Sequence, residues 1–414
     1  METILHADVV VLGGGSAGVA AAVAAARKGS QVTLIERNAY LGGKATAAEV
    51  GTICGLYRFS KNEKSDYIVR GFAREFAEIV KARSQTSPLH GPEGVHYLPY
   101  HIEAFKNICL ELIAEHKISV YFNAVMEHVT VEENKIRSVS IIANGNPVTI
   151  QLHSLVDCSG DSIISQAASL PLIKSEQYQA AAQVFTMQGV TETNEFKLGM
   201  IMMKALRAAI DENMLGDFYD RVYIVQGSLK NNTVSLKIGI PLAVTYAPGN
   251  LEELRTVAYS FIENLSKFLV THVDAFKHAY VEHIAPEVGI RIGQRSSGKY
   301  MLVEEDVLSC KKFDNAIANA AWPIEIWEQN RRVKMQYFDL DDFYQVPAGC
   351  LQSNSLDNLF FAGRNISATD AAIASARVMG ICFQTGYAAG CLAAANAQNL
   401  SLIDAIRQVQ NDQL

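Results

Sequence analysis

The chain has 414 residues, of which 49% are hydrophobic and 19% are charged, and its formal net charge is −7. A chain of this length and composition buries a large core, and we expect a globular protein of two or three domains. The acidic balance and the lack of a run rich in Lys and Arg argue against nucleic acid or an anionic membrane as the main partner.

The N-terminus leads into an apolar strand and a glycine turn. Residues 1–6 lack the basic region of a signal peptide, so we expect a cytoplasmic protein. The apolar run 7–12 stops at Gly13-Gly14-Gly15-Ser16-Ala17-Gly18 and continues as an alanine-rich helix. A strand, a glycine turn and a helix in this order predict a dinucleotide site.

Each glycine of this motif has a physical reason. Gly13 permits the tight turn, Gly15 lets a pyrophosphate approach the backbone, and Gly18 lets the helix press on the strand. The free N–H groups at the helix start, at Ser16 and Ala17, bind the anion. These five residues are therefore candidates for binding the cofactor.

A second strand, 31–35, ends at Glu36, about 18 residues after the last glycine. An acid at this distance is placed to accept hydrogen bonds from a ribose. We count Glu36 and the adjacent Arg37 with the dinucleotide site.

The next part of the chain alternates helices and strands. We expect helices at 66–83 and 102–116, and the polar loop 84–94 between them is a candidate lid. Alternating segments then predict a small antiparallel layer that crosses over the main sheet, with Asn144-Gly145 as a hairpin turn. Its strands are expected at 125–132, 135–143 and 147–153, before a buried strand at 155–158 returns the chain to the parallel sheet.

The pattern changes after residue 168. Mixed strands and longer helices follow, with a turn at Asn231-Asn232 and a helix at about 250–270. The apolar run that ends at Gly363-Arg364 then repeats the strand-into-glycine pattern. Residues 378–403 carry no charge, but their amides and many small residues predict a helix buried in protein rather than a membrane span.

The predicted fold class is therefore α/β. We expect a Rossmann-like domain with a parallel sheet and an antiparallel crossover layer, formed by residues 1–168 and 346–414. A mixed α+β substrate or cap domain, residues 169–345, is inserted into it.

The seven cysteines are scattered and include no C-x-x-C pair, which predicts reduced thiols and no zinc site. Cys54 follows a glycine-rich loop. It is either a redox thiol, a covalent flavin tether or a buried inert thiol, and the inert thiol is the commonest case.

Five separated segments resemble FAD-dependent oxidoreductases of the glutathione-reductase-like (GR2-type) flavoprotein superfamily. The resemblance implies FAD rather than NAD and no metal. The segments are Gly13 to Gly18 with Glu36, Tyr40 to Thr46, Val156 to Asp161, Pro286 to Leu302, and Asn358 to Arg364 with 366–369 and 377–379.

The resemblance also implies roles for single residues. The doublet Gly42-Gly43 runs along the FAD pyrophosphate, Lys44 adds a charge contact to phosphate, and the backbone of Val125 meets adenine. N–H groups at the start of the last long helix stabilise negative charge on the reduced flavin. The implied cofactor contacts are, besides these and the first motif, Ala45, Thr46, Ser159, Gly160, Gly363, Arg364, Met379, Gly380 and Ile381.

Two positions depart from the family pattern, because Asp370 and Gly380 stand where relatives carry His and Pro. Asp370 is a candidate to take a proton or hold an ammonium group, although a helix N-cap is the commoner role of such a carboxylate.

Other candidates for substrate contacts are cationic or aromatic. Arg291, Arg295 and Arg377 are candidates to clamp an anionic group, or else pair with acids such as Glu287. Tyr300 is a candidate to hydrogen-bond the substrate, or else a half-buried strand residue.

The absence of a second glycine motif favours a flavin that the substrate reduces. We expect a dehydrogenase or oxidase that takes a hydride from a small polar metabolite, with or without a carboxylate, at C–N, C–O or C–C. Oxygen, a quinone or a carrier protein would accept the electrons. The alternatives are an FAD-bearing electron-transfer subunit, which would expose an apolar patch, and a non-catalytic flavin-binding protein.

Overall fold

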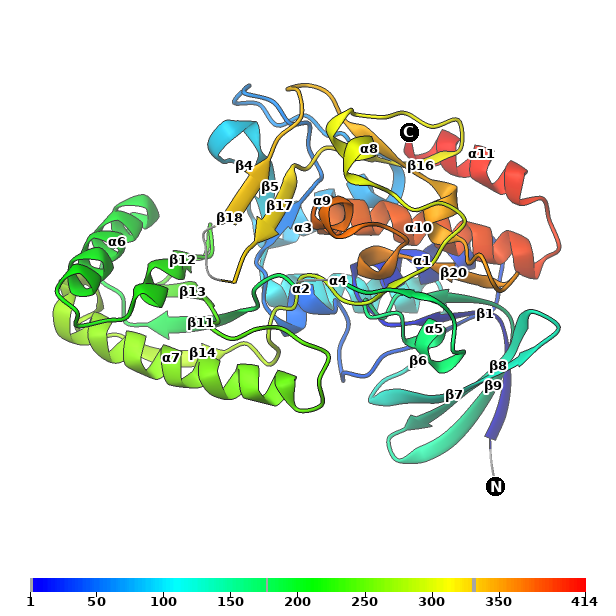
Figure 1. The fold of residues 1–414 in the computed structure, drawn as a ribbon, viewed down its shortest axis with the longest axis horizontal. Helices are drawn as coiled ribbons and strands as arrows, with labels where there is room; N and C mark the ends of the chain where they lie inside the picture. Colours follow the sequence, from blue (N-terminus) through cyan, green and yellow to red (C-terminus); the bar gives the residue numbers. More distant parts are fainter. Residues whose placement is uncertain (1–2, 176–177, 330–332) are drawn as a thin grey trace.

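The computed structural model describes residues 3–175, 178–329 and 333–414 (Figure 1). Its main sheet has the strand order β6-β2-β1-β9-β8-β7, and β20 pairs with β9. The strands are β1 (Thr3–Leu12), β2 (Val32–Ile35), β6 (Ser119–Tyr121), β7 (Ala124–Glu132), β8 (Lys135–Ala143), β9 (Asn146–Asp157) and β20 (Leu359–Phe361). Strands β6, β2, β1, β9 and β20 run parallel, which confirms the Rossmann-like fold class.

Strand β9 joins the parallel and antiparallel parts of this sheet. Its first half pairs antiparallel with β8, its end pairs parallel with β20, and β1 runs along most of its length. The expected break between strands at 147–153 and 155–158 is wrong. Ser154 lies at that point, and its hydroxyl donates to Asn396 at 2.7 Å, so this polar residue is buried in the sheet without interrupting it.

Two helices pack tightly against each other beside the sheet (Figure 1). They are α1 (Ser16–Arg27) and α10 (Met379–Ala397). A Cβ atom on Gly386 or Gly390 of α10 would lie 2.2 or 2.1 Å from the carbonyl oxygens of Ala17 and Ala21. Small residues thus let the two helix backbones touch, and this brings residues at the N-terminal ends of both helices to one cavity.

The uncharged C-terminal stretch forms the buried helix α10. Among the described residues no single helix is long and apolar enough to cross a membrane. Helix α9 (Asp370–Ala376) and α10 pass that test only together, and they are bent by 95° at their junction.

Further helices surround these elements. They are α2 (Lys44–Ala47), α3 (Gly71–Ser84), α4 (Ile102–Glu115), α5 (Ile163–Ala167) and α11 (Leu402–Gln413). The expected lid, 84–94, contains β4 (Leu89–His90), which pairs with β5 (His96–Pro99), and β5 pairs in turn with β3 (Thr52–Cys54). The described residues that line the cavity come from other segments, so a lid role for 84–94 stays a prediction.

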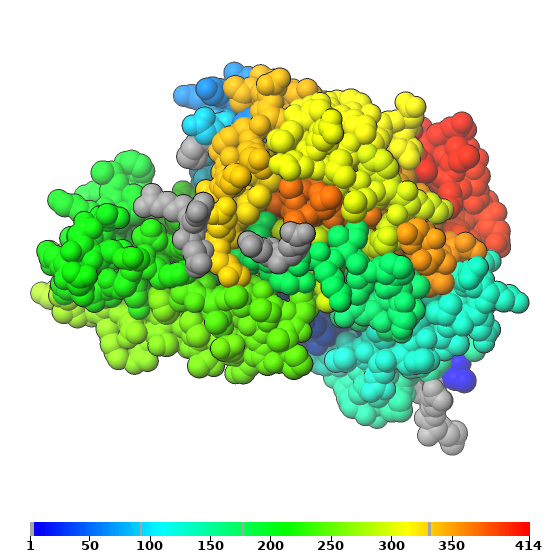
Figure 2. All heavy atoms as spheres, viewed as in Figure 1, coloured from blue at the N-terminus to red at the C-terminus, as the bar shows by residue number. Residues whose placement is uncertain are grey.

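The inserted residues form a lobe beside the main sheet, drawn in green in Figure 2. Its sheet has the order β12-β13-β11-β14, with the strands β11 (Ala182–Gln188), β12 (Val222–Ile224), β13 (Thr233–Gly239) and β14 (Tyr280–Ile284). Helices α6 (Glu195–Asp211) and α7 (Asn250–His272) pack on this sheet around a separate hydrophobic core (Figure 1).

The segment that follows the lobe packs with the main domain. Its elements are β15 (Arg295–Ser296), α8 (Glu304–Leu308), β16 (Ala316–Ala320), β17 (Ile324–Trp327), β18 (Val333–Gln336) and β19 (Tyr344–Pro347). Strand β15 pairs with β10 (Leu172–Ile173), which precedes the lobe in the chain. Ile317, Tyr344 and Phe383 of α10 belong to one core. The hydrophobic cores divide near residue 290, and the domain boundary at 345 stays a prediction.

Candidate cofactor and substrate site

A cavity of about 560 Å³ opens between the main sheet and the inserted lobe. The glycine turn after β1, the doublet before α2 and the corner after β9 line it from the main domain. Strands β11, β13 and β17 line it from the other segments. Three loops with exposed backbone thus meet side chains from the inserted lobe in one space.

The glycine turn has the geometry that its spacing predicts. Gly13 has φ +96°, and a Cβ atom on Gly18 would lie 1.7 Å from its carbonyl oxygen, so α1 and β1 are in backbone contact. A Cβ atom on Gly15 would meet only Gly43 Cα, at 3.7 Å. The backbone at Gly15 therefore opens onto the cavity, beside Ser16 and Ala17.

Glu36 fastens this turn. It is 5% exposed, and its carboxylate accepts from the backbone N–H groups of Gly14 at 2.6 Å and Asn38 at 2.8 Å. Burial raises the pKa of Glu36, and the two N–H groups oppose that rise. The carboxylate also lines the cavity, but a contact with ribose stays a prediction.

The doublet loop carries an ion pair that the sequence did not reveal. Lys44 Nζ lies 2.6 Å from Glu287 Oε2 and donates to the carbonyl of Val288 at 2.9 Å, while Arg37 Nη2 lies 2.7 Å from the same carboxylate oxygen. Glu287 thus engages Lys44, which was expected to contact phosphate, and Arg37, which was counted with the dinucleotide site. Burial opposes ionisation of Glu287, but Lys44 and Arg37 hold its pKa at about 2.

Other doublet residues divide between the cavity and the loop itself. Gly42, Gly43 and Ala45 line the cavity. Thr46 is buried, and its hydroxyl donates to the carbonyl of Leu41 at 2.7 Å. Thr46 therefore holds the loop rather than facing the cavity.

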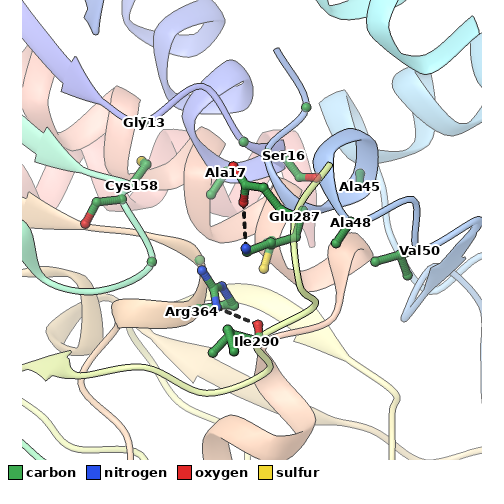
Figure 3. Close-up of a pocket in the computed structure, with 18 of the residues that line it drawn as sticks. Gly13, Ser16, Ala17, Ala45, Ala48, Val50, Cys158, Glu287, Ile290 and Arg364 are labelled. Carbon is green, nitrogen blue, oxygen red and sulfur yellow. Dashed lines mark hydrogen bonds and ion pairs between the residues drawn. The ribbon is translucent and has the colours of Figure 1, made fainter. Parts of the chain in front are cut away.

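The corner after β9 is fixed by a buried acid. Asp157 accepts from the Ser159 backbone at 2.9 Å and from its hydroxyl at 2.6 Å, and burial raises the pKa of Asp157. Gly160 and Arg364 follow in the cavity wall, and Arg364 donates to the carbonyl of Ile290 at 2.7 Å (Figure 3). Gly363 also lines the cavity. So does Val125 of β7, whose side chain is exposed.

The start of α10 reaches the cavity through fewer residues than expected. Arg377, Val378 and Met379 line it. A Cβ atom on Gly380 would lie 2.5 Å from the backbone of Gly55, and Ile381 is fully buried, so these two residues pack inside the protein. Gly380 and Ile381 were expected to contact the cofactor through their N–H groups. Neither residue lines the cavity, so that contact stays a prediction.

Cations gather on the part of the cavity wall near Trp327. The Arg291 guanidinium lies 4.0 Å from the centre of the Trp327 ring, and Arg377 lies 3.5 Å from Glu325. Burial, followed by the charge of Arg377, lowers the pKa of Arg291 to about 9, and burial lowers that of Arg377. Of the three arginines that were predicted to clamp an anion, Arg291 and Arg377 therefore line the site, whereas Arg295 pairs with Asp370 outside it.

Lys237 also lines this wall, although its sequence context did not predict a cavity residue. Its Nζ atom lies 4.7 Å from the centre of the Trp327 ring. Burial and then the charge of Arg291 lower the pKa of Lys237 to about 8. A lysine in a strand of alternating polar and apolar residues is usually an exposed sheet residue. Lys237 lines the cavity because its ammonium group lies over the Trp327 ring of β17.

Two predicted catalytic residues lie elsewhere. Asp370 starts α9 and pairs with Arg295, which is 1% exposed, and it also accepts from the hydroxyl of Ser175 at 2.8 Å. Tyr300 donates to Asp306 at 2.8 Å. Neither Asp370 nor Tyr300 lines the cavity, because each is held by a partner in the segment that packs on the main domain.

Cys54 does line the cavity, at the end of β3. Burial, followed by the charge of Glu325, raises the pKa of its thiol to about 12. A thiol that stays protonated near neutral pH is a weak nucleophile. This favours the inert thiol over the covalent tether.

Solved structures and a family model are similar to this chain. The chain is similar in structure to the anhydrotetracycline hydroxylase OxyS of Streptomyces rimosus (TM-score 0.53, 11% identity, 98% of this chain and 65% of that one). Weaker likenesses link it to a geranylgeranyl bacteriochlorophyll reductase-like protein of Thermoplasma acidophilum (TM-score 0.48, 15% identity, 99% and 83% of the chains) and to the flavin-dependent brominase Bmp2 (TM-score 0.47, 14% identity, 98% and 83%). At these identities the likeness concerns the fold.

No curated protein matches the sequence. The family model for FAD dependent oxidoreductases matches residues 8–413, which is nearly the whole chain. This protein therefore belongs to the family of FAD dependent oxidoreductases, and its cofactor is FAD.

Proposed function

We propose that this oxidoreductase, a member of the glutathione-reductase-like (GR2-type) superfamily, takes a hydride from a small polar metabolite that carries a carboxylate. The reaction is that of a dehydrogenase or oxidase at a C–N, C–O or C–C bond. The main support is that Arg291 and Arg377 line the same cavity as the glycine turn. Guanidinium groups match the planar geometry of a carboxylate.

The residues of the main domain fit FAD. Gly15 and Gly43 face each other with no side chain between them, and a Cβ atom on Gly43 would lie 2.8 Å from Gly15 Cα. Such a backbone surface at the start of α1 suits a pyrophosphate. Bound FAD supplies the hydride acceptor.

The other cavity residues bind and orient the substrate. In this proposal Arg291 and Arg377 hold its carboxylate, while the Trp327 ring keeps the Arg291 guanidinium in place. The positive end of α10 at Met379 favours negative charge on the reduced cofactor. Val184 and Val50 add apolar surface to the cavity.

Anaerobic mixing of the FAD-loaded protein with a panel of metabolites tests this proposal. The panel contains hydroxy acids, amino acids, amines, alcohols and NAD(P)H, and the visible flavin absorbance is followed. We expect bleaching by at least one acid and by none of the uncharged alcohols. Bleaching by NAD(P)H alone would contradict a substrate-reduced flavin.

An exposed apolar face supports a second candidate, the FAD-bearing electron-transfer subunit. Phe196, Met200 and Met203 are 78%, 54% and 59% exposed and follow one face of α6, at the outer edge of the inserted lobe (Figure 1). Patches of this kind mark contacts with other proteins. This candidate predicts that no metabolite reduces the isolated protein, whereas a reduced carrier protein does.

A further inference from the structure

Three cations from separate segments meet at one wall of the cavity. Lys237 comes from β13, Arg291 follows β14, and Arg377 ends α9. All three line the cavity, and the first two lie within 4.7 Å of the centre of the Trp327 ring. We call Lys237, Arg291 and Arg377 the cation cluster.

This cluster has too few counter-charges within the protein. Glu325 is its one neighbouring carboxylate among the described residues, and it lies 3.5 Å from Arg377. In the described part of the chain, Lys237 and Arg291 have no carboxylate within ion-pair distance, and Arg291 donates instead to the backbone carbonyl of Ala180. Three cations and one carboxylate leave two positive charges.

The three other acids of the cavity wall have partners of their own, and Asp161 accepts from the hydroxyl of Tyr246 at 3.1 Å. Glu287 pairs with Lys44 and Arg37, and Glu36 accepts from two backbone N–H groups. Crowding of like charges away from water raises the free energy of the ionised cluster, and the lowered pKa values of Lys237 and Arg291 reflect this. An anionic ligand relieves this cost.

We infer that the cation cluster takes a substrate with two carboxylates. This inference deepens the proposed function and rests on it. One carboxylate neutralises only half of the excess charge, whereas two neutralise all of it. Arg291 and Arg377 hold the first carboxylate, and Lys237, as a compact ammonium, binds the second.

Calorimetric titration of the FAD-loaded protein tests this inference without a known substrate. The probes are malonate, succinate and glutarate, each compared with the monocarboxylate of the same carbon number: propionate, butyrate and pentanoate. We expect at least one dicarboxylate to bind about tenfold tighter than its monocarboxylate. Equal affinities would overturn the two-carboxylate inference but leave the proposed function standing, whereas no binding by either class would overturn both.

Two lysine variants sharpen the test. Lys237→Met is expected to remove the preference for the dicarboxylate over the monocarboxylate. Lys230→Met, in an exposed turn at the end of the same hairpin, is the matched control and should keep the preference. Loss of bound FAD from Lys237→Met would overturn the inference, because the cluster would then serve the cofactor's phosphates.

Discussion

Glu287 Oε2 lies 2.6 Å from Lys44 Nζ, and this ion pair ties the segment after the inserted lobe to the cofactor loop. Arg37 contacts the same oxygen atom at 2.7 Å. The carboxylate is about 20% exposed, so solvent screens the pair only in part. The pair therefore fixes the segment after β14 against the loop that carries the Gly42-Gly43 doublet.

Replacement of Glu287 by Gln should destabilise the protein in a pH-dependent way. Lys44 and Arg37 hold the pKa of Glu287 at about 2, below its ordinary value of 4.5, so ionisation of Glu287 stabilises the fold above the unfolded pKa. At pH 7 we expect a loss of about 3 kcal/mol in the free energy of unfolding. The difference from wild type should shrink as the pH falls from about 4.5 toward 2.

Chemical denaturation of both proteins at pH 7 and pH 3 measures this effect. Glu282→Gln, which changes an exposed carboxylate on β14, is the matched control and should alter stability little. A Glu287→Gln variant whose deficit is the same at both pH values would show that the ionised carboxylate is not the cause.

Two glycine substitutions should separate cofactor binding from folding. Gly15→Val places its side chain into the cavity, since a Cβ atom at Gly15 meets nothing closer than 3.7 Å, so we expect a folded protein without FAD. Gly18→Ala brings a Cβ atom to 1.7 Å from the Gly13 carbonyl, so we expect a protein that folds poorly. Visible absorbance and circular dichroism report the two outcomes, and a Gly15→Val protein with a full flavin spectrum would refute the assignment.

Asp370→Asn should weaken the fold and spare the chemistry. The substitution removes the charge that pairs with Arg295, a residue that is 1% exposed, so we expect a loss of about 1 to 3 kcal/mol in stability. The rate of flavin reduction at saturating reductant should stay within about twofold of wild type. A large fall in that rate with unchanged stability would restore Asp370 as a catalytic residue.

The flavin should not be attached to Cys54. A thiol with a pKa of about 12 stays protonated at neutral pH and does not add readily to the flavin ring. Acid precipitation should therefore release FAD into the supernatant, from wild type and from Cys54→Ser alike. Flavin that remains on a peptide containing Cys54 would contradict this.

Local signals account for the parts of the fold that the sequence predicted well. Asn144-Gly145 and Asn231-Asn232 all have positive φ angles, and both pairs form the expected turns between strands. Gly13 and Gly18 likewise lie in backbone contact with each other, within one strand-turn-helix unit. Such features depend on a few neighbouring residues and can be read from them.

The features that the sequence did not predict depend on contacts between distant segments. Ser154 was expected to separate two strands, but Asn396, 242 residues later, satisfies its hydroxyl. Lys237 becomes a cavity residue only where β13 meets Trp327. Asp370 lies outside the cavity, where it forms an ion pair with Arg295.

We expect Arg291 to bind a substrate carboxylate in the cavity where we propose that FAD binds. Anaerobic flavin reduction by a carboxylate substrate and by its methyl ester, in wild type and in Arg291→Met, tests this directly. Wild type should strongly prefer the acid, and Arg291→Met should lose this preference while keeping its FAD. An equal rate with acid and ester in wild type would show that Arg291 does not bind a substrate carboxylate.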